Sequence, residues 1–269
     1  MADSRNYTVG RGEVHFAQFL PGTQTPGPYR YLGNTPEFNL TLESTKLDHY
    51  GSDRGIREKD ASITIEVARS GTLVCDEIKI ENVALFFFGA AERITQAGAA
   101  VVDEQINNVV LGHSYQLGQT DSNPIGAKMV AFPGTGPTLF AVKDTATPTA
   151  ATFVAGTDYV FDAERGWLTI LDGGSIEDGD DLRVSYTTLA AAYDRVRSGA
   201  NAVEGAMKFI TFNPVGKQFD YSFPFVTISP NGDFALKGEE WQQIPFSLEI
   251  LRKGSLEGVY VNGQPFTAP

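Results

Sequence analysis

The sequence predicts a mainly β protein: a β-sandwich core with one short helix, plus an inserted small β domain. Three observations support this fold class. Apolar and polar residues alternate in several short runs, which is typical of half-buried strands. The chain holds 28 glycines and 14 prolines, so turns are frequent. Hydrophobic residues make 42% of the 269 positions, which is enough to bury a core.

Two alternating runs near the N-terminus flank a long polar segment. Glu37–Glu43 (EFNLTLE) and Ser62–Val67 each predict a strand with one apolar face. The segment between them, Ser44–Asp60, is far longer than an ordinary hairpin loop, which favours a functional loop. It carries as many bases as acids, and Leu47, Tyr50 and Ile56 recur inside it. Interspersed charges of both signs suit docking against another charged surface.

The next segment, Asp76–Gly89 (DEIKIENVALFFFG), predicts the one helix. Acids near its start complement the helix dipole, and Gly89 suits the position after the C-cap. Apolar residues lie almost all round the helix from Val83 onward, so we expect it to be buried on most sides.

A second β unit is predicted at Gln119–Leu189, inserted into a core made of residues 1–118 and 190–269. Its strands are separated by turn residues at the spacing of a small sandwich or barrel. We expect them at Asp158–Asp162, Trp167–Leu171 and Leu182–Thr187.

The C-terminal part returns to the core. Its features, in order, are a strand at Tyr193–Ser198, a strand or short helix at Val203–Ile210, a strand at Asp220–Ile228 with an edge or bulge at Pro224, a hairpin turn at Asn231-Gly232 before Asp233–Lys237, an alternating strand at Gln243–Ile250, and a second turn at Asn262-Gly263.

Charge and composition exclude several functions. The formal charge is −12 and the pI is near 4.7, so no clustered basic surface for gripping phosphates is expected. The start is polar, without the apolar region of a secretory signal, and no apolar run is long enough to span a bilayer. A single cysteine, Cys75, forms no internal disulfide.

No catalytic or metal-binding pattern is found, and we expect neither enzyme activity nor a cofactor. The three histidines lack metal-ligand spacing. Two features have a functional alternative: Cys75 with His113 as a nucleophile pair, and Glu177–Asp181 as a calcium loop. A buried structural thiol and a tight acidic turn are the better interpretations of those two features.

Three stretches then carry a resemblance. Gly33–Val67 (GNTPEFNLTLESTKLDHYGSDRGIREKDASITIEV) resembles the strand–long loop–strand of siphophage tail tube (major tail) proteins. Glu81–Gly89 is similar to the helix that follows in that family. Phe212–Leu251, with its SPNGD turn and EWQQIPF strand, resembles the family's C-terminal strands. The segment 119–189 lies outside the minimal tube fold and resembles an added decoration domain.

The resemblance implies a structural virion protein. Subunits would form hexameric rings that stack into a hollow tail tube, each core adding strands to a ring-shaped β-barrel around the lumen. DNA would pass through without specific binding, other tail proteins would meet the tube ends, and no membrane would be involved. Assembly would take place in the host cytoplasm. The inter-ring contact loop would use Lys46, Asp48, His49, Tyr50, Asp53, Arg54, Arg57, Glu58 and Lys59, and the subunit-packing helix Val83, Leu85, Phe86, Phe87 and Phe88.

The acidic charge suits such a conduit, because an acidic lumen repels the DNA that a basic one would trap. About half of the acidic surplus, however, lies in the segment 119–189. The alternative function is a carbohydrate- or receptor-binding β-sandwich protein. In that case Tyr159, Trp167 and Tyr186 would stack on sugars, whereas a core role for these aromatic rings is favoured.

Overall fold

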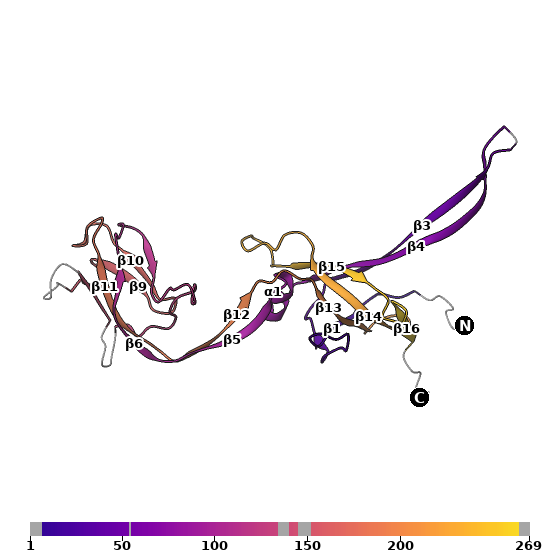
Figure 1. The fold of residues 1–269 in the computed structure, drawn as a ribbon. Helices are drawn as coiled ribbons and strands as arrows, with labels where there is room; N and C mark the ends of the chain where they lie inside the picture. The colour runs from indigo at the N-terminus through magenta and orange to yellow at the C-terminus, as the bar shows by residue number, and fades with distance from the viewer. Residues whose placement is uncertain (1–6, 54, 134–139, 145–151, 264–269) are drawn as a thin grey trace, which may run out of the picture. The chain divides into compact units, whose positions relative to one another are not determined.

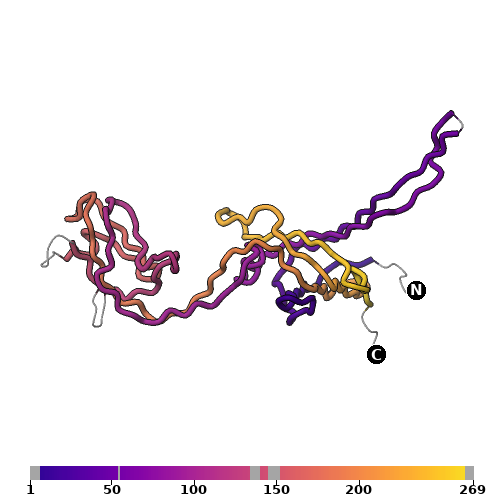
Figure 2. The backbone as a smooth tube through the Cα atoms, in the orientation of Figure 1, coloured from indigo at the N-terminus to yellow at the C-terminus, as the bar shows by residue number. Residues whose placement is uncertain are grey.

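The computed structural model describes residues 7–53, 55–133, 140–144 and 152–263. The chain is mainly β, as predicted, with several antiparallel sheets and one described helix. It divides into two compact units (Figure 1). Unit 1 comprises residues 1–92 and 195–269, and unit 2 comprises residues 93–194. The backbone trace follows the chain out of unit 1 into unit 2 and back again (Figure 2).

Unit 1 is built on one eight-stranded sheet with the order β2-β1-β13-β14-β15-β4-β3, and β16 also pairs with β14. We expected a sandwich of two sheets; the described strands of this unit instead form one sheet, covered by helix α1. Its elements are β1 (Gly12–Gln18), β2 (Arg30–Tyr31), β3 (Glu37–Gly51), β4 (Glu58–Cys75), α1 (Ile80–Phe86), β13 (Val203–Thr211), β14 (Phe219–Pro230), β15 (Ile244–Ile250) and β16 (Tyr260–Gly263).

The core of unit 1 lies where the alternating strands turn their apolar side chains inward. In β15 the inward residues are Ile244, Phe246, Leu248 and Ile250, as predicted, all at most 6% exposed. They pack with buried residues of β1, β4, β13 and β14 and with Leu85 of α1. Burying each such side chain contributes about 1.5–3 kcal/mol, so this cluster holds the sheet and the helix together.

Helix α1 is shorter than predicted and ends differently. Phe88, not Gly89, adopts the left-handed conformation after the C-cap residue Phe87, with a φ of 50°. The amide of Gly89 donates to Ala84 O (2.8 Å) and that of Phe88 to Leu85 O (3.2 Å), which is a Schellman ending. Gly89 is required for a different reason, because a Cβ there would lie 2.0 Å from the carbonyl oxygen of Arg197.

Unit 2 holds two three-stranded sheets, β7-β10-β9 and β6-β11-β8. Both contribute to one core that includes Leu168, Val184 and Tyr186. The predicted boundary at Gln119 is wrong, because β6 pairs with β11 and β7 pairs with β10, which brings residues 99–116 into this unit. Its strands are β6 (Ala99–Ile106), β7 (Ser114–Gln116), β8 (Ala141–Asp144), β9 (Tyr159–Asp162), β10 (Trp167–Ile170) and β11 (Leu182–Thr188).

The chain passes between the units through a two-stranded sheet of β5 (Ala90–Gln96) and β12 (Ala191–Arg197). Glu92 Oε1 accepts a hydrogen bond from Arg195 Nε at 2.9 Å and forms an ion pair with Arg197 Nε, also at 2.9 Å. Arg93 pairs with Asp194 at 3.0 Å. Alternating charges thus join the two strands, each such exposed pair adding about 0–1 kcal/mol.

Three details of the C-terminal part test the predicted turns. Pro224 lies at a register shift between β13 and β14, which confirms the bulge. The tight hairpin turn predicted at Asn231-Gly232 is wrong. No strand follows it at once: residues 231–243 form a loop, and β15 begins only at Ile244. The predicted turn at Asn262-Gly263 is also wrong: both residues lie in β16 and pair with Asp220 and Phe219 of β14.

Candidate assembly interface

The segment Ser44–Asp60 is not the loop that we predicted. It continues the two flanking strands into a long antiparallel hairpin, in which β3 and β4 pair from Glu37 with Val74 to Gly51 with Glu58. Only residues 52–57 lie between the strands. We call residues 42–69 of this hairpin the arm (Figure 1).

The arm leaves backbone edges open along both strands. β15 pairs with β4 only over Ser70–Cys75, and the described strands give residues 58–69 a partner in β3 alone. β3 is itself the last strand in the order of the sheet. Open edges of this length are templates for pairing with another chain, and soluble proteins normally cover or shorten them.

Apolar side chains are exposed along the same arm. Leu47 and Ile63 lie directly opposite each other and are 58% and 60% exposed. The others with large exposed fractions are Leu42, Tyr50, Ile56, Ile65 and Val67. A two-stranded ribbon is at best marginally stable alone in water. The arm therefore has the composition of a surface that is completed by a partner.

Several polar residues of the arm pair with one another. Lys59 Nζ lies 2.6 Å from Asp48 Oδ1, and the Ser62 hydroxyl donates to the same oxygen at 2.6 Å. These two hydrogen bonds lower the pKa of Asp48. His49 Nδ1 contacts the Asp60 carboxylate. The contacts hold the two strands together across the arm.

The predicted contact residues consequently fall into two groups. Asp48, His49, Tyr50, Arg57 and Lys59 have partners inside the arm, Arg57 through its guanidinium over the Tyr50 ring. Arg54 lies outside the described residues. Of the predicted contact residues, Lys46, Asp53 and Glu58 are exposed and make no such contact with the other described residues.

The helix residues are also divided by the structure. Leu85 lies in the core of unit 1, with Val83 and Phe86 packed against it. The Phe86 ring meets those of Phe234 and Phe246 at 5.6 and 6.5 Å between centroids. Phe87, just past the helix, is 41% exposed. Of the predicted packing residues, Val83, Leu85 and Phe86 therefore stabilise the fold of the subunit itself.

Other candidate chemistry has a structural explanation. Burial raises the pKa of the Cys75 thiol to about 12, so it stays protonated, and His113 belongs to the other unit. In the segment 177–181, Asp178 accepts the amide of Leu111 and Asp181 that of Asn108. These acids thereby fix the 108–111 loop. Among the described residues, no group of three His, Cys, Asp or Glu side chains is placed to hold a metal ion.

The aromatic residues proposed for sugar stacking are mostly buried. Tyr159 is 4% exposed, and Tyr186 is 1% exposed with its hydroxyl donating to Glu104 at 2.6 Å. Trp167 alone of the three is open to solvent. A stacking platform built from all three rings is therefore absent.

Sequence reasoning missed one further exposed feature, which we call the 231–243 loop. Its Phe234 packs against the core, whereas Trp241 is the most exposed large apolar side chain in the described part of the chain. The run Gly238–Gln243, with two acids directly before the tryptophan, is the sequence signal that could have indicated it.

The acidic charge is unevenly divided. Unit 2 carries 13 acids against 5 bases, and unit 1 carries 20 acids against 16 bases. The net charges are therefore −8 and −4. Most of the surplus lies outside the unit that has the arm. None of the described helices is both long and apolar enough to cross a membrane.

Comparison with known proteins adds one assignment. A family model described as "Protein of unknown function UCP028589" matches residues 7–259, which is most of the chain. The chain therefore belongs to this family. No curated protein matches it significantly.

Proposed function

As the function of this member of the family UCP028589, we propose self-assembly into stacked hexameric rings that form the hollow tail tube of a bacteriophage. The arm is the single observation that carries this proposal. It presents open strand edges and exposed apolar side chains together, and both need a second chain to cover them.

A neighbouring copy is the economical partner for the arm. Strand edges are covered most directly by β-augmentation, in which an added strand supplies backbone hydrogen bonds and its side chains fill alternate positions. When each subunit donates the base of its arm to the next subunit, the contact is heterologous, and a rotation that closes produces a ring. The tip of the arm would then reach the adjacent ring, as the resemblance implies. Sheets joined in this way around an axis form a continuous barrel without free edges.

The role of the charges follows from their division between units. With a net charge of only −4, unit 1 would line the lumen without a strong repulsive field. DNA would pass because no basic cluster retains it, rather than because the wall repels it strongly. Unit 2 would stand outside the tube as a decoration, and its larger acidic surplus would keep assembled tubes apart and soluble.

The proposal places the protein in the virion tail, assembled in the host cytoplasm, with other tail proteins at the tube ends and without enzyme activity. Imaging of the purified chain by electron microscopy tests it. A variant with residues 44–67 replaced by a short turn is the matched control. Rings or tubes from the intact chain and none from the shortened chain would support the proposal, and monomers from both would contradict it.

A further inference from the structure

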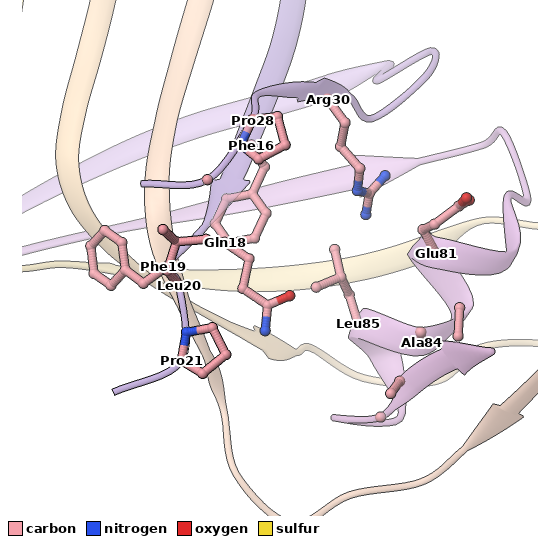
Figure 3. A pocket seen from close by; sticks show the side chains of 14 residues that line it. Phe16, Gln18, Phe19, Leu20, Pro21, Pro28, Arg30, Glu81, Ala84 and Leu85 are labelled. Atoms are coloured by element: carbon pink, nitrogen blue, oxygen red, sulfur yellow. The ribbon is translucent and has the colours of Figure 1, made fainter. Parts of the chain in front are cut away.

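The 231–243 loop of unit 1 is complementary to a cavity on the same unit. A cavity of 480 Å³ lies between β1, the turn that follows it and helix α1. Its apolar lining includes Phe16, Phe19, Leu20, Pro28 and Leu85. Figure 3 shows Arg30 reaching from the β2 side toward α1, with Leu85 and Glu81 across from it.

Arg30 lacks an acidic partner at contact distance. Its Nη1 donates to the amide oxygen of Asn82 at 2.8 Å, and no carboxylate of the described residues lies within ion-pair distance. Desolvation lowers the pKa of the guanidinium. The charge of Glu81 acts on Arg30 without a direct contact, and a carboxylate that reached the guanidinium from outside would add a charge-assisted hydrogen bond.

A second base lies at the cavity. Lys253 lies over the ring of Phe19, a lining residue, 4.8 Å from the ring centre. Arg30 and Lys253 stand against the single acid of the lining, Glu81. The surface therefore suits an apolar group that carries negative charges beside it.

The 231–243 loop presents that combination. Trp241 is 94% exposed and directly follows Glu239 and Glu240. Two contacts fix the conformation of the loop. The Phe234 ring meets the Phe86 ring edge to face, and the side-chain amide of Gln242 donates to Ala235 O at 3.0 Å. A rigidly presented tryptophan is a typical anchor for a pocket on a partner.

We propose that the 231–243 loop of one copy docks into this cavity of the next, with Trp241 filling the apolar part and Glu239 or Glu240 pairing with Arg30. The occupant is a second copy of this chain. Phe86 of α1 faces the loop while Leu85 lines the cavity, so the two surfaces lie on different sides of the helix. The contact is therefore head-to-tail, as a ring requires. This inference rests on the proposed self-assembly and names a contact within it that is separate from the arm.

The chain has two tryptophans, so Trp167→Phe leaves Trp241 as the only one. The test measures acrylamide quenching of this variant while sedimentation velocity follows its assembly with rising concentration. We expect quenching to fall several-fold, with a blue-shifted emission, in the assembled fraction. Assemblies in which Trp241 stays as accessible as in the monomer would overturn this inference and leave the proposed function standing. A chain that never assembles would overturn both.

A charge exchange tests the pairing with Arg30. Glu239→Arg with Glu240→Arg lies on an exposed loop and should leave the monomer folded while raising the concentration for half-assembly by about tenfold or more. Adding Arg30→Glu should restore assembly. Lys217→Glu, at an exposed position away from the cavity, is the control and should change little. Failure of the combined variant to recover, with its monomer folded, would contradict the pairing.

Discussion

Lys59 Nζ lies 2.6 Å from Asp48 Oδ1, across the two strands of the arm. The pair lies in the segment predicted as a loop, and it spans the two strands of the hairpin that is found there. Because the pair also receives the Ser62 hydroxyl, it fixes the strand register close to the tip. Altering the carboxylate of Asp48 should therefore change how rigidly the two strands of the arm are held together.

The first prediction concerns that carboxylate. Asp48→Asn removes the ion pair while keeping a hydrogen-bonding side chain, and we expect faster amide exchange in the arm with no change in the core of unit 1. The pKa of Asp48 is lowered on folding, so its contribution is present above the ordinary value near 3.8 and is lost as pH falls through the lower folded value. Hydrogen exchange from pH 7 down to pH 3 measures this, and a pH-independent arm would contradict it.

The second prediction concerns the apolar side chains of the arm. Leu47→Asp with Ile63→Lys changes two exposed residues and places opposite charges across from each other, so the stability of the monomer should change by only about 0.5 kcal/mol per site. Assembly should be lost, because charges would enter the covered surface. Val160→Asp in unit 2, also an exposed strand position, is the matched control. Sedimentation velocity separates the two results, and normal assembly of the double variant would remove the arm from the interface.

The third prediction concerns the tip. Arg57→Glu removes the guanidinium that lies over the Tyr50 ring at 5.1 Å from its centre. We expect impaired stacking of rings and an intact monomer, since the contact is exposed. Reversing Arg54 as well should deepen the defect. Arg57→Lys keeps the charge and should retain most stacking. Tube lengths in micrographs provide the measurement, and wild-type lengths from Arg57→Glu would exclude the tip from ring-to-ring contact.

The fourth prediction concerns Asp158 in unit 2, which is 3% exposed. Its carboxylate accepts the amides of Val154 at 2.6 Å and Ser175 at 2.7 Å, and these bonds lower its pKa. Asp158→Ala should leave both donors unpaired and destabilise unit 2 by about 1–3 kcal/mol per donor. Urea unfolding of a chain that also carries Trp241→Phe, monitored by the fluorescence of Trp167 as its one tryptophan, measures the loss. Unchanged stability would refute the role of Asp158.

Much of the fold follows from the sequence where one face of a strand is buried. β15 was predicted with the correct inward residues because burial enforces strict alternation there. Within the arm, Ser62–Val67 was predicted as a strand, whereas Ser44–Asp60 was missed because the register shifts twice, between Thr45 and Lys46 and between His49 and Tyr50, which breaks the alternation. No face of the missed segment is buried within the chain, so no core imposes a pattern on it.

The candidate site was located for sound reasons but with the wrong local structure. Mixed charges and recurring apolar residues singled out Ser44–Asp60, and these same residues make the arm. The Trp241 surface was missed, because the Asn231-Gly232 signal indicates a tight turn, and the two acids before Trp241 do not by themselves show that the next strand begins only at Ile244. That start is set by pairing with Cys75 in β4, which is a long-range contact.

Electron microscopy of the purified full chain across a range of concentrations tests whether the protein assembles into a tube. We expect hollow tubes or rings with sixfold symmetry, in which density for the arm meets the neighbouring subunit. A chain that remains monomeric at every concentration, with an ordered arm and no rings or tubes, would contradict it.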